Sequence, residues 1–176
     1  MSHTWVRGEY VASDDPTRLQ LDVIFDFLSN RSYWAKERDR ESVERSIRYS
    51  TFCIGVYDGT GRQVGFARVI TDTVVFGWVC DVFVIEEHRG RGLGKWIVEL
   101  IVNHPLVRHV KRLALRTADA HGLYEKFGFV RIEAPDGLWM ERVRREQAPT
   151  DSERRDSPEG IGGTWETRGA GMDREY

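Results

Sequence analysis

Hydrophobic residues follow two different spacings along this chain. From residue 19 to residue 47 they recur every three or four positions, as at Leu19, Val23 and Phe27, which predicts two amphipathic helices. Between residues 52 and 85 they run almost continuously between short polar turns, which predicts strands joined as hairpins. In chain order, we expect a strand at 5–11, a helix opened by Asp14-Asp15-Pro16, a helix around Val43 and Ile47, strands at 52–57, 64–70 and 74–85, a helix over 96–101, a strand at 113–115, a helix at 119–127, and strands at 129–132 and 138–143.

This order of elements limits the fold class. Antiparallel hairpins that lead into a strand-helix-strand unit predict an α/β (α+β) domain with a mixed, mostly antiparallel central sheet and helices on both faces. All of these elements fall within residues 1–146, which we interpret as one domain. Residues 147–176 are rich in Gly, Pro, Ser and charged residues, so we expect a disordered C-terminal tail there.

The composition argues against several kinds of partner. The 176 residues carry a formal net charge of -2, whereas nucleic-acid-binding domains usually show a basic surplus, so no nucleic-acid partner is expected. The two cysteines, Cys53 and Cys80, stand in apolar segments without metal-ligand spacing, so no metal is expected either. Neither a signal-like N-terminus nor a run of ~18 apolar residues occurs, which predicts a cytoplasmic protein without membrane contact.

A glycine-rich segment joins the long apolar strand to the helix over 96–101. A helix N-terminus presents unpaired N–H groups and a partial positive charge, and glycines let an anion approach the backbone closely. Arg89, Arg91 and Lys95 add positive charge nearby. Together these features predict a site for phosphate or pyrophosphate.

Two common phosphate-binding motifs do not fit this segment. A P-loop would need glycine at position 89 and Ser or Thr at position 96, where Arg89 and Trp96 stand. A dinucleotide-binding turn that began at Gly90 and Gly92 would need a third glycine where Lys95 stands. That turn also normally follows the first strand of its unit, whereas this one follows several antiparallel strands.

A third pattern fits, and it resembles a known family. The R-x-x-G-x-G spacing of Arg89, Gly92 and Gly94 resembles the acetyl-CoA motif of the GNAT superfamily of N-acetyltransferases. The segment 120–129 resembles the superfamily's A-x-x-x-Y-x-x-x-G-F signature, and the stretch 82–88 resembles its fourth strand. The resemblance covers roughly residues 5–143. It implies an enzyme that takes acetyl-CoA as co-substrate.

The resemblance also implies roles for individual residues. Tyr124 corresponds to a tyrosine that lies near the coenzyme sulfur and can protonate the leaving thiolate. Thr117 stands where many relatives have asparagine, so its contact with the cofactor is a departure from the pattern. The backbone of the fourth strand would pair with the pantetheine arm, and one N–H would polarise the thioester carbonyl. The residues expected to bind the cofactor are Phe83, Val84, Arg89, Gly90, Arg91, Gly92, Leu93, Gly94, Lys95, Thr117 and Tyr124.

The acceptor amine must lose a proton before or during attack, because an ordinary amine with a pKa of ~10.4 is protonated at neutral pH. We take Asp81 on the central strand as a catalytic candidate beside Tyr124. No spacing argument separates it from the other candidate bases, which are Asp119, His121, Glu86 and His88. Asp119 is also expected to cap the helix that begins there.

Aromatic residues are the candidates for the acceptor site. Tyr33, Trp34 and Trp78 would line it, whereas Phe25 fits core packing better. Such a wall suits an apolar amine or a cation, and the acceptor would be an amine of a small molecule or a peptide. A non-catalytic acyl-CoA-binding module on the same fold is the alternative function. Analogy with this fold also allows a homodimer.

Overall fold

The centre of the molecule is a six-stranded sheet with the strand order β1-β2-β3-β4-β5-β6. The computed structural model describes residues 2–132 of the chain. Neighbouring strands run antiparallel, except that β5 and β6 are parallel. The strands are β1 (Thr4–Arg7), β2 (Tyr10–Ser13), β3 (Phe52–Tyr57), β4 (Gln63–Thr71), β5 (Phe76–Val84) and β6 (Arg112–Ala114).

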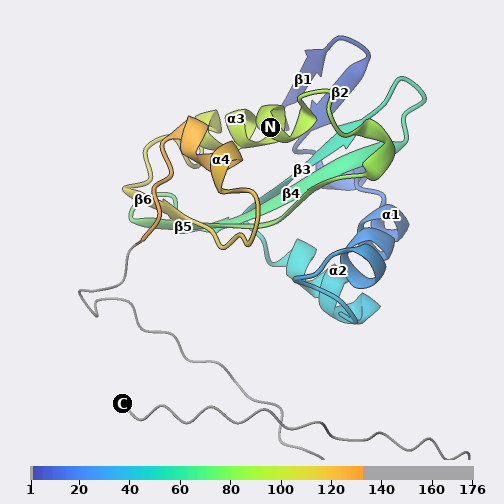
Figure 1. The fold of residues 1–176 in the computed structure, drawn as a ribbon, viewed down its shortest axis with the longest axis horizontal. Coiled ribbons are helices and arrows are strands. Elements are labelled where there is room, and N and C mark those ends of the chain that lie inside the picture. The colour runs from blue at the N-terminus through green and yellow to red at the C-terminus, as the bar shows by residue number, and fades with distance from the viewer. Residues whose placement is uncertain (1, 133–176) are drawn as a thin grey trace, which may run out of the picture. The chain divides into compact units, whose positions relative to one another are not determined.

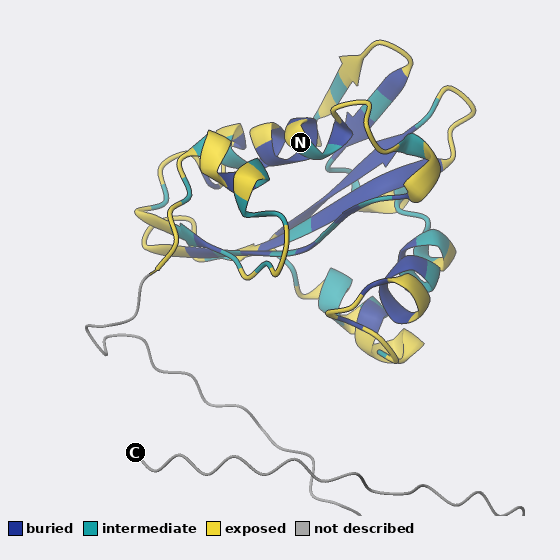
Figure 2. Ribbon diagram, viewed as in Figure 1, coloured by how far each residue is buried: buried dark blue, intermediate teal, exposed yellow. Residues whose placement is uncertain are grey.

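Helices cover both faces of this sheet, as the sequence predicts. α1 (Leu21–Asp26) and α2 (Arg40–Arg48) lie on one face, and α3 (Leu93–Asn103) and α4 (His121–Tyr124) lie on the other (Figure 1). The buried residues concentrate in the central strands β3 and β4 and on the inner side of α3 (Figure 2). No helix in residues 2–132 combines the length and apolar character needed to cross a bilayer.

A glycine in β4 sets how closely α3 approaches the sheet. A Cβ placed on Gly65 would lie 3.1 Å from Cδ1 of Ile97 in α3 and 3.3 Å from the carbonyl oxygen of Phe83. Both contacts are tighter than ordinary packing, so a larger residue at this position would push α3 outward. Gly65 therefore helps to place the N-terminal turn of α3 beside the end of β5.

β5 departs from regular geometry in two ways that matter for the site. Its pairing with β4 passes from Phe66↔Phe83 to Arg68↔Cys80, so β5 contains one extra residue, and Asp81 within this bulge has a φ of +51°. β6 pairs with β5 only at Phe76–Trp78, so in the described part of the chain the two strands separate beyond Trp78. Within residues 2–132, the edge of β5 from Val79 to Val84 consequently has no strand beside it on that side.

Three predicted boundaries differ from the structure. The single strand expected at 5–11 is a hairpin, because Gly8 turns the chain with a φ of +59° between β1 and β2. The Asp15 side chain accepts the Thr17 N–H and so caps a turn, as expected. That turn is only a short 3-10 segment, however, and α1 begins at Leu21. After Asp26 the helix widens into a π-type turn that ends at Arg31.

The C-terminal strands are a further difference. Residues 129–132 form no strand within the described part of the chain, and Val130 and Ile132 are exposed there. An isolated extended segment gains no ladder hydrogen bonds, so a strand forms only where a partner pairs with it. The strand expected at 138–143, the boundary at residue 146 and the tail 147–176 all lie outside the described residues.

A cluster of polar groups fastens the N-terminal hairpin to the end of α3. Nε2 of His104 and Nδ1 of His3 lie 3.0 Å and 2.7 Å from the same oxygen of Asp14. Nδ1 of His104 accepts the Leu106 N–H, so the proton of the neutral ring sits on Nε2 and faces Asp14. The ring also stacks on Phe52 with 3.9 Å between centroids. Burial lowers the pKa of His104, and the bond to Asp14 only partly offsets this.

This arrangement predicts that the protein loses stability in mild acid. As the pH falls below the ordinary histidine pKa of 6.5, the unfolded chain takes up a proton that folded His104 resists, so the free energy of unfolding decreases. The variant His104→Gln keeps an N–H for Asp14 and does not titrate. Urea unfolding at pH 7.5 and pH 5.5 should therefore show a smaller pH dependence in the variant than in the native protein; equal dependence in both would contradict the assignment.

Candidate active site

The turn between β5 and α3 is built from backbone that only glycine adopts easily. Gly90 and Gly92 have φ values of +76° and +79°, and α3 begins directly after Gly92. The first intrahelical bond runs from the Trp96 N–H to the Gly92 carbonyl. The N–H groups of Leu93 and its two successors therefore have no acceptor within the helix and point beyond its N-terminus.

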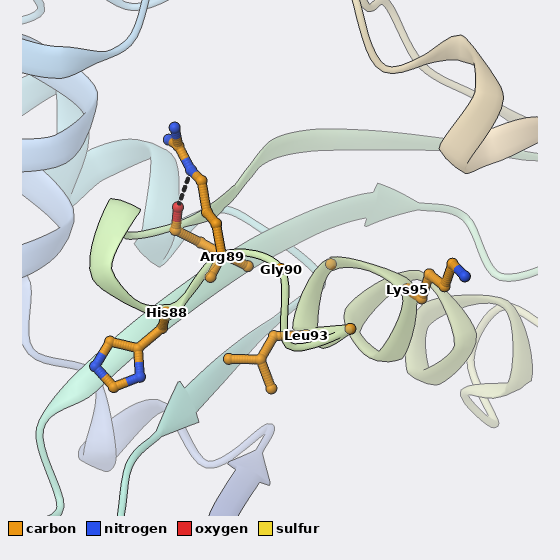
Figure 3. Close-up of a pocket in the computed structure, with 8 residues that line it drawn as sticks. His88, Arg89, Gly90, Leu93 and Lys95 are labelled. Carbon is orange, nitrogen blue, oxygen red and sulfur yellow. Dashed lines mark hydrogen bonds between the residues drawn. The ribbon is translucent and has the colours of Figure 1, made fainter.

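These groups border a pocket at the end of β5. Its volume is about 380 Å³, and Figure 3 shows eight residues that line it. A Cβ placed on Gly90 or Gly92 would meet no atom within 4 Å, so the space in front of both glycines is open. A negatively charged group can thus reach the N-terminal N–H groups of α3 directly. The lining residues are Val84, His88, Arg89, Gly90, Gly92, Leu93, Gly94 and Lys95.

The cationic side chains around the turn are engaged to different degrees. Arg89 folds back along β5, where its Nε donates to the Val84 carbonyl at 3.0 Å and its Nη2 pairs with Glu86 at 2.9 Å (Figure 3). Arg91 donates from Nη1 to the Tyr10 hydroxyl at 2.8 Å. Lys95 has no ion pair among the described residues and is the most available cation. The N–H groups at the start of α3 are consequently, with Lys95, the donors of the turn that an anion could use.

Tyr124 lies at the end of α4, close to the segment that follows β6. Its side chain is buried, its ring meets the Phe129 ring edge-on, and its hydroxyl has no hydrogen bond within residues 2–132. Burial raises the pKa of Tyr124 to about 12, with smaller contributions from Tyr33 and Asp119. The phenol therefore keeps its proton at neutral pH and can donate it.

Thr117 takes a role that was expected of Asp119. Its Oγ1 accepts the Ala120 N–H at 3.0 Å at the start of α4, where no side chain caps the helix at its N-cap position. The prediction that Asp119 caps this helix is therefore wrong. The hydroxyl of Thr117 still has its own proton to donate.

The structure separates the five candidate bases. Both oxygens of Glu86 are in ion pairs, with Arg31 and Arg89, and its pKa is lowered: burial raises it, but backbone hydrogen bonding and the two arginines outweigh burial. Nδ1 of His88 lies 2.9 Å from the Tyr10 hydroxyl. Asp81 is held by two arginines and an indole. Of the five, Asp119 and His121 are the two whose side chains have no hydrogen bond or ion pair within the described part of the chain.

Two of the three aromatic candidates, Tyr33 and Trp34, contact each other, whereas the third, Trp78, contacts another ring. The rings of Tyr33 and Trp34 meet edge-on with 4.9 Å between centroids, and Nε1 of Trp34 donates to Asp81. Trp78 lies three residues before Asp81 on β5, and its ring stacks on that of Phe76.

Comparison with known proteins places the chain in a family. Residues 48–131 match the model of the acetyltransferase (GNAT) domain. A candidate acetyltransferase of Gibberella zeae is 36% identical over 142 residues, which cover 69% of this chain and 79% of that protein. The crystal structure of a candidate GNAT-family acetyltransferase from Xanthomonas campestris is 38% identical, with a TM-score of 0.72 over 78% of this chain and 96% of that one.

The chain belongs to the GNAT family of acetyltransferases. It is accordingly an acyltransferase with the GNAT fold, as the sequence predicts. An uncharacterised N-acetyltransferase of Porphyra purpurea, ycf52, is also similar, at 30% identity over 114 residues; the match spans 61% of that relative.

The residues expected to bind the cofactor can be compared with the lining of the pocket. Most of them line the pocket at the turn, but Phe83 does not, because its ring stacks on Phe27 at 4.0 Å in the core. Any contact of Phe83 with a cofactor must therefore come from its backbone. Arg91, Thr117 and Tyr124 also lie outside that pocket's lining. Sequence reasoning missed Arg38 and Arg68 beside Asp81, because no local pattern links positions so far apart.

A matched pair of variants tests whether the turn binds the cofactor. Gly61, in the β3–β4 turn, has a φ of +83° and open space at its Cβ, so it shares the backbone state of Gly92 far from the pocket. Gly92→Ala and Gly61→Ala should both cost about 1 kcal/mol of stability. Only Gly92→Ala should weaken coenzyme A binding, by about tenfold or more, because its methyl group enters the anion's approach.

Isothermal titration calorimetry measures the affinity of each variant for coenzyme A, and urea unfolding measures its stability. Equal coenzyme A affinity in the two variants would show that the turn does not bind the pyrophosphate.

Proposed function

We propose that this protein transfers an acetyl group from acetyl-CoA directly to a primary amine of a small molecule or peptide. The observation that supports this most is the turn from β5 to α3, where two left-handed glycines open a pocket onto unpaired helix N–H groups. A pyrophosphate is the anion that suits such a row of donors. The family generally uses acetyl-CoA, which agrees with this geometry.

The open edge of β5 supports binding of the rest of the cofactor. From Val79 to Val84 the described part of the chain offers no strand partner on that side, so an extended pantetheine arm could pair with backbone groups there. The Val84 carbonyl is the exception, since it already accepts from Nε of Arg89. Phe83 and Val84 would supply these groups, directly before the pocket. One N–H near the bulge would then donate to the thioester carbonyl and stabilise the charge that develops on it.

The co-substrate supplies an activated thioester carbon, which the amine nitrogen attacks while the bond to sulfur breaks. Tyr124 would donate its phenolic proton to the departing sulfur, because its raised pKa keeps that proton in place until a thiolate forms. Neither cysteine fits a covalent role, since burial raises the pKa of Cys53 to about 12 and also raises that of Cys80.

The proton of the acceptor amine needs another group. Asp119 and His121 flank the start of α4 and keep their side chains unpaired within residues 2–132, so we assign this role to one of them, directly or through water. Tyr33 and Trp34 would line the acceptor site, with Trp78 further along β5. The alternative of a non-catalytic acyl-CoA-binding module finds no support among the similar proteins. A homodimer, a cytoplasmic location and the absence of a metal stay predictions from the sequence.

Turnover with a panel of amines tests the proposal. Mixing the protein with acetyl-CoA and each of a set of aryl-alkyl amines, polyamines, amino acids and lysine peptides should release free thiol with at least one of them. Coenzyme A binding without thiol release from any amine would favour the non-catalytic alternative. An unchanged melting curve in the presence of acetyl-CoA would contradict both functions.

A second pair of variants tests the role of Tyr124. Tyr124→Phe removes the phenolic proton and should lower kcat by about 10- to 100-fold while acetyl-CoA affinity stays close to native. Tyr49→Phe is the control, because Tyr49 is 72% exposed at the end of α2 and should leave both quantities unchanged. A native kcat in Tyr124→Phe would remove this residue from the acid role.

A further inference from the structure

The carboxylate of Asp81 joins β5 to two other segments of the chain on the α1–α2 side of the sheet. Its Oδ2 accepts from Nε of Arg68 at 2.6 Å and from Nη1 of Arg38 at 2.8 Å. Its Oδ1 accepts from Nε1 of Trp34 at 3.1 Å. The Asp81 side chain is only 3% exposed, so these protein groups replace nearly all of its water. Both lone pairs of Oδ2 are therefore occupied.

The backbone conformation of Asp81 indicates what the ion pair with Arg68 stabilises. Asp81 has a left-handed φ at the β5 bulge, a conformation that costs energy for any residue other than glycine. Arg68 projects from the neighbouring strand β4, at the position where the pairing register shifts. The ion pair thus ties the bulge to the next strand and offsets part of the strain.

Two of the three donors come from one loop, residues 32–39, which connects the π-type turn to α2. Trp34 and Arg38 lie four residues apart in it, so the carboxylate holds the loop at two points. Tyr33, next to Trp34, accepts the Ala118 N–H on its hydroxyl at 2.9 Å. The loop is therefore fastened at one side to the bulge of β5 and at the other to the segment between β6 and α4.

We infer that Asp81 is a positioning residue that holds the 32–39 loop and its aromatic pair against the acceptor side of the active site, and is not the base. This inference rests on the proposed function. Accepting the amine proton would neutralise Asp81 and leave two guanidinium groups without their counter-ion in a largely buried place. Burial raises the pKa of Asp81, but the hydrogen bonds and charges of Arg38 and Arg68 outweigh it and lower the pKa, which agrees.

The variant Asp81→Asn removes the charge and keeps the shape. Loss of the two ion pairs should loosen the loop, so hydrogen exchange in peptides covering residues 32–39 should accelerate, and KM for the acceptor should rise about tenfold or more. The pH at which kcat/KM for the acceptor falls off in acid should stay native. Acetyl-CoA affinity should change by less than about threefold, because the pyrophosphate turn is untouched.

Two further variants make the test independent of how well Asp81→Asn folds. Trp34→Phe removes the indole N–H together with the smaller of the two fused rings, from a residue that is 40% exposed, so it should fold normally and reproduce the faster exchange in the loop and part of the KM increase. Asp22→Asn is the control, since Asp22 also pairs with an arginine, Arg40, but its side chain is 86% exposed and lies away from the pocket. It should leave exchange and kinetics unchanged.

The outcomes separate this inference from the proposed function. A large fall in kcat with native acceptor KM, native loop exchange and loss of the acid limb would identify Asp81 as the base and overturn the inference. Native loop exchange in both Asp81→Asn and Trp34→Phe would overturn it as well. If the native protein acetylates no amine, the proposed function fails, and the exchange measurement still decides whether Asp81 holds the loop.

Discussion

Backbone hydrogen-bonding groups without a partner in residues 2–132 gather where β5 ends, and the proposed chemistry depends on them. β6 leaves β5 after three paired residues, and the helix that follows β5 begins with N–H groups that have no internal acceptor. Unpaired N–H groups are costly when buried, so they must face water or a ligand. The parting of two strands and the start of a helix thus leave two sets of backbone groups near the same pocket, one at the edge of β5 and one at the N-terminus of α3.

On the α1–α2 side of the sheet, charged side chains determine the arrangement around β5. There the bulge at Asp81 brings a carboxylate among two guanidinium groups and an indole, and the loop that carries the aromatic pair is bound to it. A buried carboxylate with several donors is stable only as a set, since removing one partner leaves another charge unmatched. In the proposed function one strand therefore has two roles: the main chain at its edge would contact the cofactor, and the side chains at its bulge would order the acceptor side.

The parts of this arrangement that could be predicted from the sequence are those that depend on residues close together in the chain. The strand-to-helix turn is local: its glycines, arginines and lysine lie close together at 89–95, so the sequence alone predicts an anion site at Gly90, Gly92 and their neighbours. The structure adds that both glycines have a positive φ and open space in front of them. The hairpins between residues 52 and 85 could be predicted because each consists of two apolar segments joined by a short polar turn. The hairpin at Gly8 is not predicted, because a single glycine between alternating residues also fits a continuous strand. Asp119 is wrongly predicted as a helix cap because an acidic residue suits a helix start, whereas the Thr117 hydroxyl is the group that accepts the Ala120 N–H.

The network around Asp81 could not be predicted in the same way, because its members are separated by 13 to 47 positions along the chain. Asp81 itself was singled out as a candidate base, since an acidic residue inside an apolar strand invites that interpretation. Its partners change the interpretation: a carboxylate between two arginines is a weak base and a strong anchor. If the proposed function holds, cofactor binding and acceptor binding are specified by different kinds of information, a short main-chain motif for the first and a dispersed set of side chains for the second. A change of acceptor could then arise from substitutions in the 32–39 loop and its anchor while the grip on the cofactor stays intact.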